Sequence, residues 1–196
     1  RFYDVTAGNV EIDGNNVTKY PFSQLRKKIG MVPQQAVLFK GTIRDNMKWG
    51  KEDASEEEIQ RALSIAQASD FVNSKPEGLN TMVSQGGANL SGGQRQRLTI
   101  ARALVGNPEI LIMDDSASAL DFATDAALRH AIHEQTKGMT VFIVSQRATS
   151  IKQADKILVL DDGELVGTGT HKELMESCEV YREICLSQLS EQEVNR

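Results

Sequence analysis

The sequence predicts an α/β fold with a mainly parallel sheet. Residues 110–113 and 141–144 are continuous apolar runs, the composition of strands that are buried on both faces of such a sheet. Between these runs, Leu128, Ala131 and Ile132 fall on one side of a helix. Because apolar strands alternate with helices along the chain, the pattern indicates the α/β class.

Two shorter strands are predicted in the N-terminal part. Residues 8–14 alternate apolar and polar side chains and end in an Asp13-Gly14 turn. Residues 29–32 are a short apolar strand that Pro33 stops, because proline has no N–H to donate to a sheet.

A helix-rich, polar segment is predicted from about residue 52 to residue 108. Ser55 opens one helix with a capping box, since a glutamate follows three residues later. A glycine-rich stretch at residues 86–93 opens the next helix, predicted from Gln94 to about Val105.

The C-terminal part is predicted to contain a β-hairpin and a helix. The hairpin joins residues 157–160 to 165–166 through an Asp162-Gly163 turn. Thr170 begins a second capping box before the last helix. We therefore expect a core of residues 1–51 and 109–188, a helical subdomain at about 52–108, and a tail at 189–196.

Bulk composition limits the possible functions. A chain of 196 residues with 40% hydrophobic residues is long enough for one α/β domain. A net charge of −5 argues against a general nucleic-acid binder, which would carry a basic face. No apolar run approaches the ~18 residues that a membrane-spanning helix needs. Because the chain opens at Arg1 without an initiator methionine, we expect a segment of a longer protein.

Two acids stand together after the predicted strand at residues 110–113. Ligands of open α/β sheets bind beyond the carboxyl ends of the strands. Asp114 there is suited to hold Mg²⁺, and Asp115 beside it to orient a water molecule. A solvated pair of aspartates in a turn is the alternative.

The glycine-rich helix start is a second place for chemistry. Leu90-Ser91-Gly92-Gly93-Gln94 would present free N–H groups and the positive end of a helix dipole, which together bind anions. This signal alone is weak, because glycine-rich helix starts are common.

The longer string around that helix is specific. LSGGQRQRLTIARAL followed by ILIMDDSASALD resembles the signature motif, Walker B strand and D-loop of ATP-binding cassette (ABC) ATPases. IGMVPQQAVLFKGTIRDNM resembles the Q-loop segment of the exporter subfamily, and ADKILVLDDGELVGTGTHKEL the pattern beyond the switch region. The resemblance runs from residue 1 to about 188. It implies a P-loop NTPase-like core with a helical ABC subdomain.

The resemblance also implies cofactors and site residues. ATP and Mg²⁺ would be bound, with Gln34 and Asp114 at the metal. ATP would lie between the Walker motifs of one cassette and the signature of another. The residues implied to bind ATP of the partner are Leu90, Ser91, Gly92, Gly93 and Gln94, and those of the D-loop are Ser118, Ala119, Leu120 and Asp121.

Three departures from the family pattern bear on mechanism. The phosphate-cradling G-x-x-x-x-G-K-[ST] loop is absent from this segment, which alone is therefore expected to be inactive. Asp115 stands where the family has its catalytic glutamate, and a shift near 1 Å costs ~10²-fold in rate. Gln146 replaces the switch histidine, and an amide cannot become a cation or shuttle a proton.

Together these features imply the degenerate-site half of a heterodimeric exporter. Its own site would hydrolyse ATP poorly, while its signature would complete the active site of a second cassette. The implied partners are that cassette and transmembrane domains, at the cytoplasmic face of the cell membrane. A non-hydrolysing regulatory module is the alternative. A soluble ABC protein of DNA repair is disfavoured, because only a compact helical segment separates Q-loop and signature.

For several other residues the sequence leaves the role open or indicates no special function. Phe39, Ile43 and Trp49 would line a groove for a transmembrane coupling helix or belong to the ordinary core. Gln85 and Gly86 stand where exporters usually carry Glu and often Arg, which puts the usual ion pairs to the membrane part in doubt. We expect His130 and His133 to be surface residues, His171 to be structural, and Cys178 and Cys185 to be reduced thiols.

Overall fold

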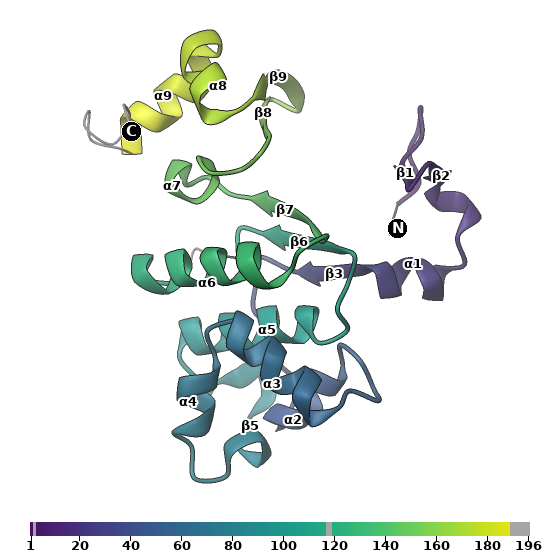
Figure 1. The fold of residues 1–196 in the computed structure, drawn as a ribbon, viewed down its shortest axis with the longest axis vertical. Coiled ribbons are helices and arrows are strands. Elements are labelled where there is room, and N and C mark those ends of the chain that lie inside the picture. The colour runs from purple at the N-terminus through teal and green to yellow at the C-terminus, as the bar shows by residue number, and fades with distance from the viewer. Residues whose placement is uncertain (2, 117–118, 189–196) are drawn as a thin grey trace. The chain divides into compact units, whose positions relative to one another are not determined.

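The computed structural model describes residues 1, 3–116 and 119–188 (Figure 1). The chain divides into two compact units, Arg1–Phe142 and Ile143–Arg196. None of the helices in the described ranges is both long and apolar enough to cross a membrane.

The sheet of the first unit is built on one parallel pair. Strand β3 (Ile29–Val32) pairs with β6 (Ile110–Asp114) in a register that sets Val32 opposite Met113. Strand β7 (Thr140–Val144) extends the order to β3-β6-β7. The α/β class with a parallel sheet is thereby confirmed.

The helices of the first unit pack around one apolar core. Four of them, α2 (Ile43–Lys48), α3 (Glu56–Ile65), α4 (Ser69–Asn73) and α5 (Gly92–Leu104), gather on one side of the β3–β6 pair in Figure 1. The longest helix, α6 (Phe122–Gln135), adds Leu128 to the same core. Burying these stripes of apolar side chains stabilises short helices that would be marginal alone.

Smaller elements surround this core. A hairpin of β1 (Glu11–Ile12) and β2 (Asn15–Asn16) precedes α1 (Phe22–Lys28). Strands β4 (Gly41–Thr42) and β5 (Met82–Val83) form an antiparallel pair. Single 3₁₀ turns occur at Val17–Lys19, Gly78–Asn80 and Gln85–Gly87.

The second unit has a small core of its own. Its described elements are α7 (Ala148–Ile151), the hairpin of β8 (Ile157–Asp161) and β9 (Glu164–Gly169), α8 (His171–Ser177) and α9 (Glu179–Gln188). Cys178 and Cys185 are free thiols buried in this core. The His171 ring lies there too, with Nδ1 2.9 Å from the hydroxyl of Tyr181. These placements agree with a structural histidine.

Local sequence signals for helix starts are confirmed. Ser55 and Thr170 both form complete capping boxes, and the Asp162-Gly163 turn joins β8 to β9. The signature helix begins at Gly92 rather than Gln94, because Ser91 is its N-cap and Gln94 completes a third box. The first turn of a helix thus includes both glycines.

Two strand predictions were wrong in extent or burial. Only Glu11–Ile12 of residues 8–14 is a strand, and Val10 is 49% exposed. The strand at residues 141–144 is not buried on both faces, since Phe142 is 51% exposed while Val141 packs on the core. Strand β7 is an edge strand of the β3-β6-β7 sheet, so only one of its edges is paired within the described chain.

Candidate functional site

The signature segment is held by its own side chains at the start of α5. The backbone N–H of Gln94 donates to Ser91 Oγ at 3.2 Å, and the N–H of Ser91 donates to Gln94 Oε1 at 3.1 Å. The amides of Gly92 and Gly93 fall in the first turn, where a helix offers no internal acceptor. Two N–H groups and the positive helix end are therefore without an acceptor inside the helix, as the predicted anion site requires.

The two glycines of this turn have different surroundings. A Cβ built on Gly92 would meet no heavy atom within 4 Å, so the backbone there is open to an approaching group. A Cβ on Gly93 would lie 3.4 Å from the carbonyl oxygen of Ala119. The signature turn is thus open on one side and packed against the D-loop on the other.

Two arginines that sequence reasoning missed tie the start of this helix to its surroundings, one to the preceding loop and one to the turn between α3 and α4. Arg95 Nη1 donates to the carbonyl of Leu90 at 2.8 Å. Arg97 Nη1 donates to the carbonyl of Gln67 at 2.8 Å. The sequence did contain a signal for these two arginines. They are basic residues just inside a helix that follows a glycine-rich loop. Their bonds fix the direction in which the helix start points.

The predicted metal residues share one edge of the sheet. Val32 and Met113 are opposite each other in the parallel pair. Gln34 lies two residues beyond Val32, Asp114 is the last residue of β6 and Asp115 follows it, so all three lie at the carboxyl ends of the two strands. Carboxylate and amide oxygens suit Mg²⁺, which usually takes one or two carboxylates and completes its shell with phosphate oxygens and water. The donor set fits a magnesium nucleotide.

Asp115 has an unusual backbone. Its φ of 40° lies in the left-handed region, which few residues other than glycine adopt. This conformation turns the chain away from the β6 direction directly after Asp114. Asp115 is therefore set by a turn, and its side chain is half-buried.

The described part of the D-loop is a helix cap. Asp121 is the N-cap of α6, and its Oδ1 accepts the backbone N–H of Thr124 at 2.9 Å. That bond, with a second from the Thr124 hydroxyl, holds the pKa of Asp121 below its usual value. Leu120 is buried and Ala119 exposed. Ser118, the first predicted D-loop residue, lies outside the described residues.

Gln146 belongs to the second unit, two residues after β7. Its side chain is exposed, and its backbone carbonyl accepts a hydrogen bond from Gln188 Nε2 at 2.7 Å. Gln188 Oε1 in turn accepts the backbone N–H of Ala148 at 3.0 Å. Gln188, the last described residue of α9, therefore bonds to residues 146 and 148 of the switch loop, one on each side of Arg147. The joint action of Gln146 and Asp115 stays a prediction.

Segments 38–43 and 81–87 lie side by side, and their exposed residues form one surface. Gly41 pairs with Val83, and the N–H of Ile43 donates to the carbonyl of Thr81 at 3.0 Å. Gly86, at a φ of 67°, donates to the carbonyl of Leu38 at 3.1 Å. The continuation of the Q-loop segment is therefore linked through its backbone to the segment that contains Gln85 and Gly86.

Buried Asn46 supports this surface from beneath. Its Oδ1 accepts the backbone N–H of Phe39 at 2.8 Å, and its Nδ2 donates to the carbonyls of Phe39 and Thr42 at 2.9 and 3.0 Å. Asn46 was not among the predicted residues, although an amide on the apolar face between Ile43 and Met47 is a detectable signal.

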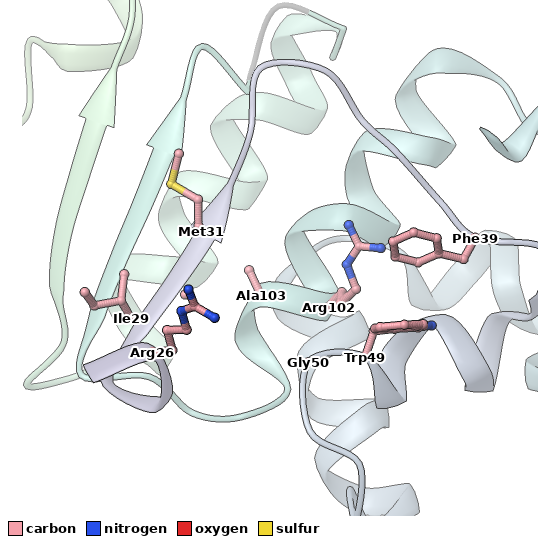
Figure 2. Close-up of a pocket in the computed structure, with 9 residues that line it drawn as sticks. Arg26, Ile29, Met31, Phe39, Trp49, Gly50, Arg102 and Ala103 are labelled. Carbon is pink, nitrogen blue, oxygen red and sulfur yellow. The ribbon is translucent and has the colours of Figure 1, made fainter. Parts of the chain in front are cut away.

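A groove of about 300 Å³ opens beside this surface (Figure 2). The structure separates the three residues whose role was left open. Ile43 is fully buried and belongs to the core, whereas Phe39 and Trp49 are 43% and 68% exposed and line the groove. Their ring centroids are 4.7 Å apart. The other lining residues are Arg26, Ile29, Gly30, Met31, Gly50, Arg102 and Ala103.

Known proteins resemble nearly all of this chain. The sequence pattern of the family described as ABC transporter matches residues 1–118. A Mycobacterium bovis protein, named as an uncharacterized ABC transporter ATP-binding protein, is 45% identical over 96% of this chain and 32% of its own length. A Staphylococcus aureus protein with the provisional name of a multidrug export ATP-binding/permease protein is 42% identical, over 94% of this chain and 32% of its own.

The fold has a close counterpart among solved structures. A bacterial Atm1-family ABC exporter with ATP bound matches with a TM-score of 0.93 and 38% sequence identity. The match covers 97% of this chain and 34% of the exporter chain. The chain thus spans about a third of the length of the relatives it matches.

Proposed function

The chain belongs to the ABC transporter family, and we propose that it serves as the ATP-binding part of a membrane exporter with two unequal nucleotide sites. In this proposal ATP with Mg²⁺ binds between two cassettes, and its binding and hydrolysis are coupled to transport. The chain contributes its signature to one site and its Walker B and switch residues to the other. The partner is a second, non-identical cassette that has a glutamate and a histidine at the positions of Asp115 and Gln146.

The signature half of this proposal is supported by the start of α5. The first-turn amides of Gly92 and Gly93 are donors for the oxygens of a terminal phosphate, and the capping box keeps them in place before the nucleotide arrives. Donors that are already oriented stabilise developing negative charge without reorganisation. These groups would therefore support hydrolysis at the site that this chain shares with the partner's Walker motifs.

The degenerate half is supported by Asp115 and Gln146. The carboxylate of Asp115 is one methylene shorter than that of glutamate, and its backbone turns away from β6. A water molecule held by the Asp115 carboxylate would lie farther from the phosphorus of the terminal phosphate than one held by glutamate. Gln146 could donate only an uncharged amide hydrogen bond to that phosphate. This site would hold its nucleotide for longer than it takes the other site to turn over.

The surface of residues 38–43 and 81–87 is the proposed contact with the transmembrane domains. Phe39 and Trp49 expose aromatic rings beside it, and aromatic side chains are enriched in protein interfaces. Segment 38–43 follows Gln34 in the sequence, and segment 81–87 precedes the signature. A displacement of this surface would therefore be transmitted to both nucleotide-binding regions. In the full-length exporter this surface would face the cytoplasmic side of the membrane.

The single observation that carries the proposal is an intact signature turn in a chain whose catalytic positions are Asp115 and Gln146. The test uses the assembled full-length transporter. Gly93→Asp, which sets a carboxylate among the phosphate donors, should lower ATP turnover about 10²-fold, the usual effect of losing such donors. Asp115→Asn should change turnover less than about threefold, because the slow site contributes little.

Two outcomes would contradict this assignment. Equal losses from Gly93→Asp and Asp115→Asn would mean that both sites work alike. No measurable hydrolysis in the unmodified transporter, together with nucleotide-dependent association of the cassettes, would favour the regulatory module. Nucleotide binding should be measured in parallel, so that a lost signal is assigned to binding or to turnover.

A further inference from the structure

Helix α9 brings the side chain of Gln188 to the start of α7, the short helix that follows the switch loop. Arg147 is the N-cap residue of α7, and its side chain makes no cap hydrogen bond. The first N–H groups of a helix have no acceptor within that helix. Gln188 Oε1 supplies an acceptor from outside, because it accepts the N–H of Ala148 at 3.0 Å. A residue 40 positions later in the chain therefore caps this helix.

The same side-chain amide also holds the residue before the cap. Gln188 Nε2 donates to the carbonyl of Gln146 at 2.7 Å. These two contacts fix the orientation of the amide, because turning it over would bring two donors together and two acceptors together. Between them, the N–H of Arg147 donates to Ser145 Oγ at 3.0 Å. The backbone of the switch loop is thus held by side chains at three successive residues.

Helix α9 is itself anchored in the core of the second unit. Tyr181 and Cys185 lie one turn apart on this helix, and their exposed fractions are 1% and 0%. The Tyr181 hydroxyl lies 2.9 Å from Nδ1 of His171 on α8. Gln188 follows Cys185 by three residues and therefore continues the same side of the helix. Packing of the helix thus sets the position of Gln188, although its own side chain is exposed.

The side chain of Gln146 has no such support of its own. It is exposed, and no hydrogen bond from it to another described residue is recorded. Its direction therefore depends on the backbone to which it is attached. Because Gln188 binds that backbone at the Gln146 carbonyl, α9 decides where the Gln146 amide can reach.

We propose that Gln188 is a positioning residue of the slow nucleotide site, and that it makes this site prefer ATP to ADP by holding Gln146 within reach of the terminal phosphate. This inference rests on the proposed function, in which the Gln146 amide donates to that phosphate. ADP lacks the terminal phosphate, so a correctly held Gln146 stabilises only bound ATP. A loosened switch loop would have to be ordered again when ATP binds, and the entropy lost in ordering it weakens binding.

The first experiment compares the affinities for ATP and ADP. Equilibrium dialysis is performed in the cold with the full-length transporter, in which the phosphate-loop lysine of the partner cassette is replaced by alanine. The nucleotide that remains bound then reports the site of this chain. Gln188→Ala should weaken ATP binding about five- to tenfold, the effect of losing these hydrogen bonds, and should change ADP binding less than about twofold.

Two further variants separate the contact with Gln146 from general loosening of α9. Gln188→Glu has nearly the same size and keeps an acceptor for the Ala148 N–H, but it sets a carboxylate against the Gln146 carbonyl. It should therefore weaken ATP binding at least as much as Gln188→Ala does. Ser187→Ala is the matched control on the same helix, and both affinities should stay within about twofold of the original.

A double-mutant cycle shows whether Gln188 acts through Gln146. In a Gln146→Ala background, Gln188→Ala should have no further effect on ATP binding, because the side chain that it positions is gone. Additive losses, or equal losses for ATP and ADP, would overturn the inference. Circular dichroism of each variant shows whether the second unit has remained folded.

The cycle also distinguishes this inference from the proposed function. If Gln146→Ala weakens ATP binding and Gln188→Ala does not, the positioning role is wrong and the proposed function stands. If Gln146→Ala itself leaves ATP binding unchanged, the place of Gln146 in the proposed site is wrong, and the role of Gln188 is refuted with it.

Discussion

The Cα of Gly93 faces the carbonyl oxygen of Ala119, so closely that an added Cβ would stand 3.4 Å from that oxygen. This relationship joins the first turn of the signature helix to the D-loop, 26 residues later in the chain. Because a Cβ at Gly93 would stand at an ordinary van der Waals distance, substitutions at this position can test the effect of an added charge.

Gly93→Ala should leave the stability of the fold within about 1 kcal/mol of the original, because the Cβ fits and alanine favours the helix. Gly93→Asp should also fold, yet abolish most turnover through its charge. Thermal unfolding and ATP turnover of the two variants should be compared in the full-length protein. A Gly93→Ala variant that unfolds far more easily would show that the contact with Ala119 is tighter than described.

Restoring the family residues should accelerate the slow site. Asp115→Glu combined with Gln146→His should raise single-site turnover about tenfold or more, since the carboxylate regains ~1 Å of reach. The gain is expected to be incomplete, because a φ of 40° is less favourable for glutamate than for aspartate. Turnover is measured with the partner's own catalytic glutamate replaced by glutamine. An unchanged rate would place the limit elsewhere in the site.

Gln188 should hold the switch loop in place. Gln188→Ala removes the two hydrogen bonds to Gln146 and Ala148, each of which contributes about 1 kcal/mol. Hydrogen exchange at the Ala148 amide should therefore accelerate roughly five- to tenfold. Ser187→Ala is the control, because within the described residues the Ser187 hydroxyl donates to the carbonyl of Ile184 in its own helix. Equal acceleration in both variants would point to general fraying of α9.

Removal of the buried Asn46 side chain should destabilise the first unit. Asn46→Ala leaves the N–H and carbonyl of Phe39 without their partner and is expected to destabilise the protein by about 2–3 kcal/mol. Denaturant unfolding measures this loss. Asn80→Ala, at an exposed site, should cost under about 0.5 kcal/mol. Similar values for the two would mean that water replaces the Asn46 bonds.

Acid should loosen several helix starts together. Hydrogen bonds from backbone N–H groups at the caps lower the pKa of Asp45, Asp121 and Glu173 below the ordinary values of 3.8 and 4.5. A lowered pKa in the folded state contributes stability that is present above the ordinary value and is lost as the pH falls below it. The free energy of unfolding should therefore decline below about pH 4.5.

This pH dependence has a direct control. Asp121→Asn keeps a side-chain acceptor for Thr124 but cannot titrate, so the decline should become shallower in that variant. A curve that keeps the same slope would assign the acid sensitivity to other carboxylates.

Much of the local structure could be predicted from the sequence alone. The Ser55 and Thr170 boxes and the Asp162-Gly163 turn depend on residues within four positions of each other, so the sequence contains all the interacting groups. The family could also be predicted from the sequence, because the signature and the Walker B strand are each continuous stretches of residues. The predicted start of the signature helix was wrong by two residues, because Ser91 is the N-cap and the helix begins at Gly92.

Tertiary structure decided what contacts what. The sequence by itself determined the class of fold and the family, and from the family resemblance it predicts that Asp115 and Gln146 stand at the catalytic positions. It did not determine that Gly41 pairs with Val83, that Ile43 is core while Trp49 is exposed, or that Gly50 brings Arg102 to a groove. Caps and motifs are short-range interactions, whereas register, burial and close backbone approach depend on segments that meet only when the whole chain has folded.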